Sequence, residues 1–216
     1  MMRRYRTLFL DLDDTLYPSG NGVWDAIGDR INQYMLERHG IPSEKIPELR
    51  DSYFRNYGTT LHGLMVHHGA DPGDYLNFVH DIPLDEYLQP NPELKAMLSR
   101  LPQQLVIFTN ASRDHVHRVL QCLDIAGHIN AIVDIETMEL HHKPQPRAYQ
   151  IALEIAGEDN ARACVLIDDR IENLLPGASL GMTTVHVKDM IIDGPADFHI
   201  PSITDLLSAI PQLVED

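Results

Sequence analysis

An apolar run near the N-terminus leads directly into a cluster of acids, and few folds accommodate that combination. Residues Thr7 to Leu10 suit a strand that is buried on both faces of a parallel sheet. Asp11, Asp13 and Asp14 follow where that strand is expected to end. Uncompensated carboxylates are costly inside a core, whereas open α/β sheets bind ligands at the carboxyl ends of their strands. The stretch therefore predicts an α/β fold with a site at this edge, where a hard cation such as Mg²⁺ offsets the negative charge.

The spacing of two of these acids has a chemical consequence. Side chains alternate along an extended segment, so Asp11 and Asp13 are expected to point the same way. One carboxylate can then attack as a nucleophile while the other transfers a proton nearby. The alternative from this stretch alone is a solvated acidic turn after a strand.

Beyond residue 92 the apolar pattern alternates between helix and strand. Strands are expected at residues 105–108, 131–135, 165–167 and 183–187. Helices are expected at residues 93–101, 116–123, 148–155 and 171–178, with a short surface helix at 202–207. Such alternation predicts a doubly wound parallel sheet, a Rossmann-like core with right-handed crossovers.

The segment between the first two expected strands carries only helical patterns. Helices are expected at about residues 23–35, 43–57, 61–68 and 74–80. Turn residues stand at both ends, in Pro18-Ser19-Gly20 and in Gln89-Pro90-Asn91-Pro92. We therefore expect a helical cap at residues 18–88, inserted into a catalytic core of residues 1–17 and 89–216.

Composition narrows the partners of this chain. A formal net charge of −15 opposes attraction to a nucleic acid polymer, although a small phosphorylated metabolite remains a possible partner. The sequence has no apolar run long enough for a membrane helix. Cys122 and Cys164 are isolated in apolar surroundings, which predicts two free thiols rather than a disulfide or a metal pair. These features predict a cytoplasmic protein, and we expect a monomer or a homodimer.

Polar residues follow two further expected strands. Thr109-Asn110-Ala111-Ser112 can donate hydrogen bonds to a phosphoryl group beside a helix N-terminus, or it can simply cap that helix. Asp168 and Asp169 repeat the acidic strand end seen at Asp11. Oxygen ligands from two neighbouring strand ends are what an octahedral Mg²⁺ site requires.

A single lysine completes the set. Lys143 lies in Lys143-Pro144-Gln145-Pro146, ahead of an expected helix, where the prolines stiffen its approach. A fixed ammonium group is what a nucleophilic carboxylate beside a phosphate dianion needs. The alternative is a solvated surface lysine.

Taken in order, these segments resemble the four motifs of the haloacid dehalogenase superfamily of phosphatases. The first is Asp11-Leu12-Asp13-Asp14-Thr15-Leu16, and the others contain Thr109, Lys143 and the pair Asp168-Asp169 with Asn173. The resemblance implies a Mg²⁺-dependent phosphomonoesterase with an aspartyl-phosphate intermediate. The roles that it implies are a nucleophile at Asp11, a general acid and base at Asp13, phosphate contacts from Thr109, Asn110 and Lys143, and metal ligation by Asp11, the Asp13 carbonyl and Asp169, with Asp168 acting through water or as an orienting group.

A narrower resemblance points to the pyrimidine 5′-nucleotidase branch of this superfamily. It rests on the extension of the first motif through Tyr17-Pro18, on Phe108-Thr109-Asn110-Ala111, and on the cap segment from Tyr57 to Leu64. It implies a nucleoside 5′-monophosphate phosphatase with pyrimidine preference, in which Tyr57, Gly58, Thr59 and Thr60 contact the substrate. A helix break with ordinary caps is the other interpretation of those four residues. Other functions left open are hydrolysis of a sugar phosphate or pyridoxal phosphate, 2-haloacid dehalogenation, and non-catalytic binding.

The remaining polar residues carry weaker signals. His67-His68 and His141-His142 are pairs without a spaced third ligand, so surface or packing roles are expected rather than zinc. His142 is expected near the site because it precedes Lys143. Arg170 stands where the resembling phosphatases often have a small residue, and its role stays open.

Overall fold

A computed structural model describes residues 5–189 and 194–214. The chain divides into two compact units, one of Met1–Ser19 with Leu88–Asp216 and one of Gly20–Tyr87. The core range expected from the sequence, residues 1–17 and 89–216, includes residues 1–4, 190–193 and 215–216, which lie outside the described residues. The two units are described separately.

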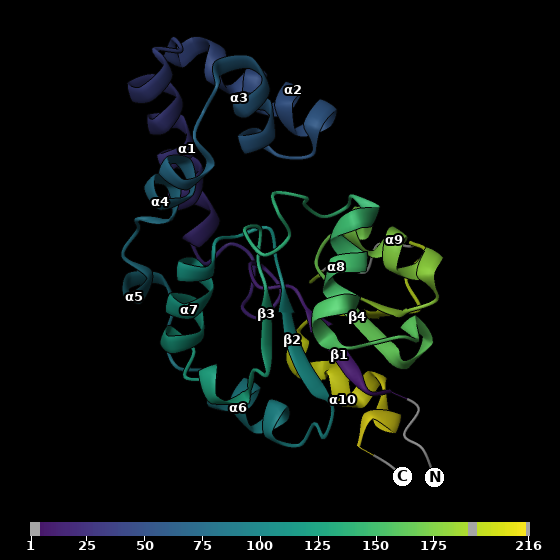
Figure 1. Cartoon of the computed structure of the whole chain (residues 1–216). Helices are drawn as coiled ribbons and strands as arrows, with labels where there is room; N and C mark the ends of the chain where they lie inside the picture. The colour runs from purple at the N-terminus through teal and green to yellow at the C-terminus, as the bar shows by residue number, and fades with distance from the viewer. Residues whose placement is uncertain (1–4, 190–193, 215–216) are drawn as a thin grey trace. The chain divides into compact units, whose positions relative to one another are not determined.

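The larger unit is built on a six-stranded parallel sheet in the order β3-β2-β1-β4-β5-β6 (Figure 1). Its strands are β1 (Thr7–Leu10), β2 (Gln104–Phe108), β3 (Ala131–Val133), β4 (Cys164–Asp168), β5 (Thr183–Val187) and β6 (Phe198–Ile200). The order reverses direction between β1 and β4, which is the switch point where open α/β sheets bind ligands. The predicted doubly wound α/β fold is confirmed.

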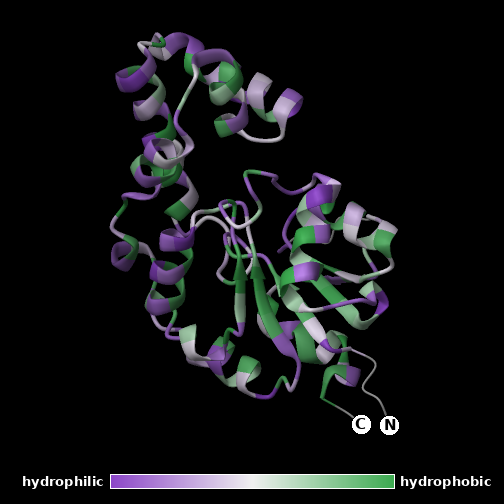
Figure 2. Cartoon of the chain, in the orientation of Figure 1, coloured by the Kyte–Doolittle hydropathy of each residue, from purple (hydrophilic) through white to green (hydrophobic). Residues whose placement is uncertain are grey.

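The central strands β1 and β4 are buried, and they are apolar except for Thr7 at the start of β1 and Asp168 at the end of β4. Every residue of β1 and of β4 is buried, and Leu8 of β1 pairs with Leu105 on one side and Val165 on the other. Figure 2 shows these strands as hydrophobic segments in the middle of the unit. A strand covered on both faces needs such a continuous apolar run.

Helices cover both faces of the sheet. They are α6 (Pro92–Ser99), α7 (Arg113–Cys122), α8 (Pro146–Ala156), α9 (Ile171–Leu180) and α10 (Leu206–Ala209), with short 3₁₀ helices η2 (Ala126–His128), η3 (Ala161–Ala163), η4 (Ile203–Asp205) and η5 (Pro211–Leu213). Figure 1 shows α8 and α9 against one face and α6 and α7 on the other. Right-handed crossovers between parallel strands produce this division.

Some predicted elements differ in extent from the observed ones. β6 was not predicted, because Phe198–Ile200 is only three residues long and only Ile200 is buried. β3 ends at Val133, two residues before the predicted end, and the expected tail helix at 202–207 is η4 followed by α10. Each error lies at an edge of the unit, where partial burial weakens the apolar pattern.

The smaller unit is entirely helical in its regular structure. It contains α1 (Val23–His39), η1 (Ser43–Lys45), α2 (Ile46–Tyr57), α3 (Thr60–His68), α4 (Pro72–His80) and α5 (Leu84–Tyr87). α1 packs on α4 and α2 packs on α3. Gly63 of α3 allows the second contact, because a Cβ atom there would stand 2.3 Å from Cγ of Tyr53.

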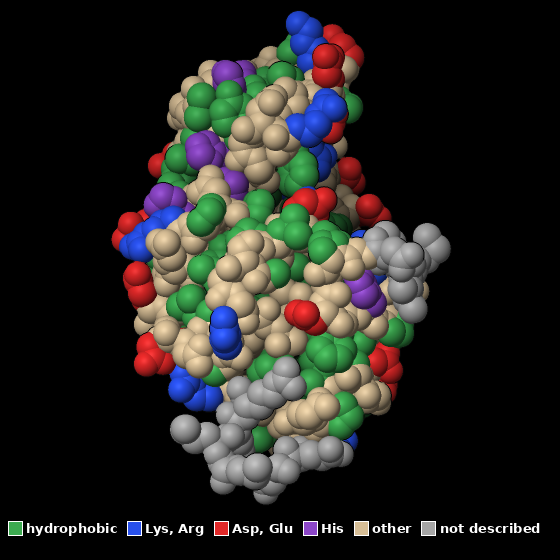
Figure 3. Space-filling model, turned by 90° about the vertical axis from the view of Figure 1, so that its right-hand side faces the viewer, with side chains coloured by type: hydrophobic (Ala, Val, Ile, Leu, Met, Phe, Trp, Pro, Cys, Tyr) green, Lys and Arg blue, Asp and Glu red, His purple; other side chains and the backbone are tan. Residues whose placement is uncertain are grey.

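Two surface properties follow from the described residues. Every helix among residues 5–189 and 194–214 is too short or too polar to span a bilayer. On the face in Figure 3, the Lys and Arg side chains lie scattered among acidic ones rather than gathered in one basic patch. This distribution agrees with the strongly acidic composition.

Candidate active site

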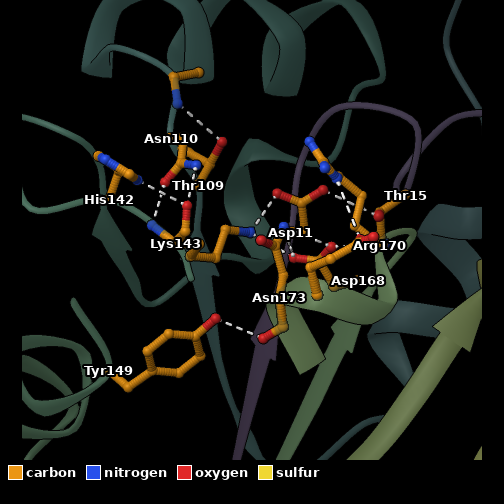
Figure 4. A network of polar contacts seen from close by, with 12 residues as sticks. Asp11, Thr15, Thr109, Asn110, His142, Lys143, Tyr149, Asp168, Arg170 and Asn173 are labelled. Carbon is orange, nitrogen blue, oxygen red and sulfur yellow. Dashed lines mark hydrogen bonds and ion pairs between the residues drawn. The ribbon is translucent and has the colours of Figure 1, made fainter. Parts of the chain in front are cut away.

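The end of β1 places the first acid at the centre of a buried polar network (Figure 4). The Asp11 amide still pairs with the Ile167 carbonyl at 2.9 Å, which carries the sheet ladder one residue past β1. Its Oδ2 accepts a hydrogen bond of 3.1 Å from the Thr15 hydroxyl. Asp11 is thereby held at the carboxyl edge of the sheet, with its carboxyl side chain nearly buried.

Lys143 joins two strand ends through its ammonium group. Nζ donates to Oδ1 of Asp11 at 2.7 Å and to Oδ2 of Asp168 at 2.6 Å. Lys143 itself is 2% exposed. A buried ammonium between two carboxylates has its charge compensated within the protein, which its burial requires.

The end of β4 supplies the other two carboxylates. Oδ1 of Asp168 accepts from the Arg170 amide and from Nδ2 of Asn173, both at 2.9 Å. Tyr149 supports Asn173 by donating its hydroxyl to the Asn173 carbonyl. Asp169 follows, with Nζ of Lys188 3.8 Å from its Oδ2.

Burial and neighbouring charges shift the ionisation of Asp11 and Asp169. Burial raises the pKa of Asp11 well above its usual range, with Lys143 opposing and Asp168 and Asp169 adding to the rise. Burial and the charge of Asp168 raise the pKa of Asp169 to about 7. For Lys143, burial lowers the pKa, but Asp11 and Asp168 outweigh it and the net pKa is raised. Burial thus opposes ionisation of Asp11 and Asp169, and a further positive charge beside them would favour their charged forms.

This donor set fits a hard divalent cation. One oxygen each from Asp11, Asp168 and Asp169 lie within 4.8 Å of one another. Carboxylate oxygens are the ligands that Mg²⁺ prefers. A positive charge bound among them would lower the pKa values of Asp11 and Asp169 and so favour their carboxylate forms.

The segment after β2 holds the lysine in place. Asn110 binds the Lys143 backbone twice, since Oδ1 accepts from the Lys143 amide at 2.8 Å and Nδ2 donates to its carbonyl at 3.0 Å. Buried His142 contacts the same carbonyl through Nδ1 at 3.0 Å. Thr109 is buried beside them, and its hydroxyl oxygen accepts from the Ala111 amide. The predicted phosphate contacts therefore meet at one place, with the Asn110 side chain engaged by Lys143.

Asp13 lies in the same loop as Asp11 and has its own partners. The Tyr17 hydroxyl and Nε2 of His115 both contact its Oδ1. His115 was not predicted from the sequence, yet it stands in the buried stripe of α7 with Val116 and Val119. A polar residue at a buried position of an otherwise apolar helix face was the only sign of this contact in the sequence. The helical spacing indicates that His115 is buried, but it does not identify Asp13 as its partner.

The expected substrate residues Tyr57 to Thr60 belong to the helical unit, at the junction of α2 and α3. Gly58 ends α2 with a φ of 80°, a left-handed conformation that glycine adopts easily. Oγ1 of Thr59 accepts from the His62 amide and so caps α3. Tyr57 donates to or accepts from His67, whose Nε2 lies 2.6 Å from its hydroxyl. The capping interpretation of Gly58 and Thr59 is thus observed, and a substrate role remains a prediction.

Sequence comparison places the chain among hydrolases. Residues 5–181 match the family model described as haloacid dehalogenase-like hydrolase. Phosphate metabolism protein 8 of Saccharomyces cerevisiae is 28% identical over 203 residues, which make up 87% of this chain and 62% of that protein. The chain therefore spans less than two thirds of the length of this relative.

Solved structures agree in fold. The HAD-hydrolase YfnB of Bacillus subtilis, solved bound to magnesium, has a TM-score of 0.64 at 18% identity, covering 95% of this chain and 98% of that one. A HAD phosphatase of Thermococcus onnurineus has a TM-score of 0.65 at 17% identity, with 94% and 96% covered. L-2-haloacid dehalogenase of Xanthobacter autotrophicus, with chloropropionic acid covalently bound, has a TM-score of 0.62 at 13% identity and the same coverage. At these identities the likeness concerns the fold alone.

Proposed function

We propose that this chain, which belongs to the haloacid dehalogenase-like hydrolase family, is a Mg²⁺-dependent phosphomonoesterase that works through an aspartyl-phosphate. The observation that carries the proposal is the contact of Lys143 with Asp11 and Asp168, next to Asp169. This cluster offers a nucleophile, a fixed cation and a set of oxygen ligands at one strand edge. The name of the yeast relative, which refers to phosphate metabolism, agrees with it.

Each residue has a chemical role in the proposal. Asp11 attacks phosphorus and forms the covalent intermediate, while Asp13 protonates the leaving alcohol and later takes a proton from the attacking water. Thr109 and Lys143 bind the oxygens of the phosphoryl group, whose negative charge the ammonium compensates. Asn110 fixes the backbone of Lys143 through its two hydrogen bonds.

The acidic cluster is the proposed metal site. Asp11, Asp169 and the Asp13 carbonyl would hold Mg²⁺, with Asp168 acting through water or orienting its neighbours. When bound, the ion supplies positive charge that reduces repulsion between Asp11 and a dianionic phosphate ester. The raised pKa values of Asp11 and Asp169 support a site that is completed by a cation.

A 2-haloacid dehalogenase is the second candidate, because solved dehalogenases share this fold. Such an enzyme also needs an aspartate nucleophile, but displacing a halide from carbon requires neither a proton donor at Asp13 nor a cluster of three acids. The partners of Asp13 and the proximity of Asp169 therefore favour phosphate ester hydrolysis.

A release assay tests the proposal. The purified protein would be given UMP, CMP, a sugar phosphate, pyridoxal phosphate and 2-chloropropionate, each with Mg²⁺ and with chelator. We expect phosphate release from at least one ester, and only with the metal. Halide release without phosphate release, or full phosphate release in chelator, would contradict the proposal.

We further propose a preference for pyrimidine nucleoside 5′-monophosphates, with Tyr57, Gly58, Thr59 and Thr60 as the substrate-binding residues. The rings of Tyr57, His62 and His67 gather at this junction, with centroids of Tyr57 and His62 5.9 Å apart, and aromatic rings can stack on a base. Thr60 is the better residue for a test, because Thr59 already caps α3.

Thr60→Val removes a hydroxyl and keeps the shape of the side chain. Loss of a hydrogen bond to the base or sugar would lower kcat/KM for UMP more than kcat/KM for p-nitrophenyl phosphate. Expressed as transition-state free energy, the difference between the two losses would be about 1–3 kcal/mol. Thr59→Ser, which keeps the capping hydroxyl, is the matched control. Equal losses on the two esters would leave this junction a structural role only.

A further inference from the structure

Two buried aromatic side chains contact one oxygen of Asp13. The Tyr17 hydroxyl donates to Oδ1 at 2.5 Å, and Nε2 of His115 lies 2.9 Å from the same atom. Tyr17 is 3% exposed and the His115 side chain is fully buried, whereas the Asp13 side chain keeps 14% of its exposure. We propose that Tyr17 and His115 are positioning residues that orient Asp13 for proton transfer. The inference rests on the proposed phosphomonoesterase function.

The two partners come from different elements of the larger unit. Tyr17 stands four residues after Asp13, in the segment that follows β1. His115 lies in the first turn of α7, where its amide donates to the hydroxyl oxygen of the N-cap residue Ser112. Asp13 is therefore held from its own loop and from a helix that begins after β2. Both partners are rings within packed surroundings, so they have little rotamer freedom with which to release the carboxylate.

The two contacts matter for the chemistry. Both are made to Oδ1 of Asp13. With this oxygen held by two partners, the carboxyl group keeps a defined position from which it gives its proton to the substrate. As the bond from phosphorus to the leaving oxygen breaks, that proton moves to the leaving oxygen and Asp13 becomes a carboxylate. Hydrogen bonds from Tyr17 and His115 then stabilise the charge that remains.

A purely structural role makes a different prediction. If Tyr17 and His115 only join the β1 loop to α7, their loss disturbs the site for every substrate in the same proportion. If they position the proton donor, the loss depends on how much the leaving group needs a proton. Phenolate is a poorer leaving group than p-nitrophenolate, and the 5′-alkoxide of a nucleotide is poorer still.

The experiment compares kcat/KM, which covers the steps up to bond cleavage, on p-nitrophenyl phosphate, phenyl phosphate and UMP in the presence of Mg²⁺. The variants are Tyr17→Phe, which removes only the hydroxyl, and His115→Leu, which removes the ring nitrogens. His115→Gln tests rescue by a side chain that keeps a donor. His117→Leu is the matched control, because His117 lies exposed on the same helix. Thermal unfolding of each variant is measured alongside.

We expect the losses for Tyr17→Phe and His115→Leu on phenyl phosphate and UMP to exceed those on p-nitrophenyl phosphate by about 10-fold or more. His115→Gln should recover part of the difference, and His117→Leu should match the wild type. Equal losses on all three esters, or no loss, would overturn this inference while the phosphatase proposal stands. A wild-type protein that hydrolyses none of the esters would overturn both.

Discussion

At the scale of residues, the site depends on one buried ammonium group and on what holds it. Lys143 reaches Asp11 and Asp168 over 2.7 Å and 2.6 Å, and removing a partner from such a buried group leaves a charge uncompensated. The position of this ammonium group also depends on where the Lys143 backbone lies. The side-chain amide of Asn110 forms hydrogen bonds with both the backbone amide and the backbone carbonyl of Lys143.

Asn110→Ala is therefore expected to lower activity through Lys143. Losing the two hydrogen bonds should cost about 1–3 kcal/mol in the free energy of unfolding and reduce kcat by about 10-fold or more. Urea unfolding and steady-state kinetics measure the two effects. Asn130→Ala is the control, because Oδ1 of Asn130 also accepts from a backbone amide, that of Leu105, in a different part of the unit. An unchanged kcat in Asn110→Ala would show that Lys143 needs no such support.

Sequence patterns predicted which charged residues share this edge, because carboxyl ends of parallel strands meet there. Asp11 and Asp168 follow apolar runs. The prolines after Lys143, in Lys143-Pro144-Gln145-Pro146, indicated a lysine on a rigid segment. The contact between His115 and Asp13 could not be predicted, since it joins residues 102 positions apart through the geometry of a loop and a helix. Periodicity locates a face, but it does not give the distance between side chains on separate elements.

At the scale of elements, close approaches between neighbours decide where a larger side chain is tolerated. Gly63→Ala would place a Cβ atom 2.3 Å from Cγ of Tyr53, an atom that cannot move without shifting α2. We expect a loss of about 1–3 kcal/mol in stability, measured by thermal or urea unfolding. Gly28→Ala is the control within α1, where the nearest atom, of Arg50, is 3.6 Å away and the helix should gain slightly. Equal stability in the two variants would contradict this packing.

Elements with strong apolar runs were predicted well, and weak ones were not. β1 and β4 are buried at every residue, so their runs were visible in the sequence. β6 is a three-residue edge strand of Phe198, His199 and Ile200 that gains its structure by pairing with β5. Pairing to an existing sheet leaves little mark on so short a segment.

At the scale of the whole molecule, the acidic cluster links metal binding, pH and stability. Because the pKa of Asp169 is raised to about 7, the metal-free folded protein binds more protons than the unfolded chain between the ordinary aspartate range and about pH 7. The contribution of Asp169 to the free energy of unfolding therefore falls as pH rises through that window. Mg²⁺ competes with the same proton, so the increase in Tm that it causes should be larger at about pH 8 than at about pH 6.

Differential scanning fluorimetry with and without Mg²⁺ at the two pH values measures this linkage. In Asp169→Asn, both the metal effect and its pH dependence should be lost or greatly reduced. Lys45→Gln, an exposed change in the helical unit, serves as the control that keeps both. A Mg²⁺ effect of equal size at the two pH values would contradict the assignment of Asp169 to the metal.

The central claim, that Asp11 attacks a phosphate ester, is tested most directly by trapping the intermediate. The protein is mixed with an excess of a hydrolysed ester and Mg²⁺, quenched in acid within a single turnover, digested and analysed by mass spectrometry. The account predicts a phosphoryl group on the peptide that carries Asp11 in the wild type, none in Asp11→Asn, and a fall in kcat of about 10³-fold or more in that variant. Turnover without a phosphorylated peptide, or near-normal activity of Asp11→Asn, would contradict it.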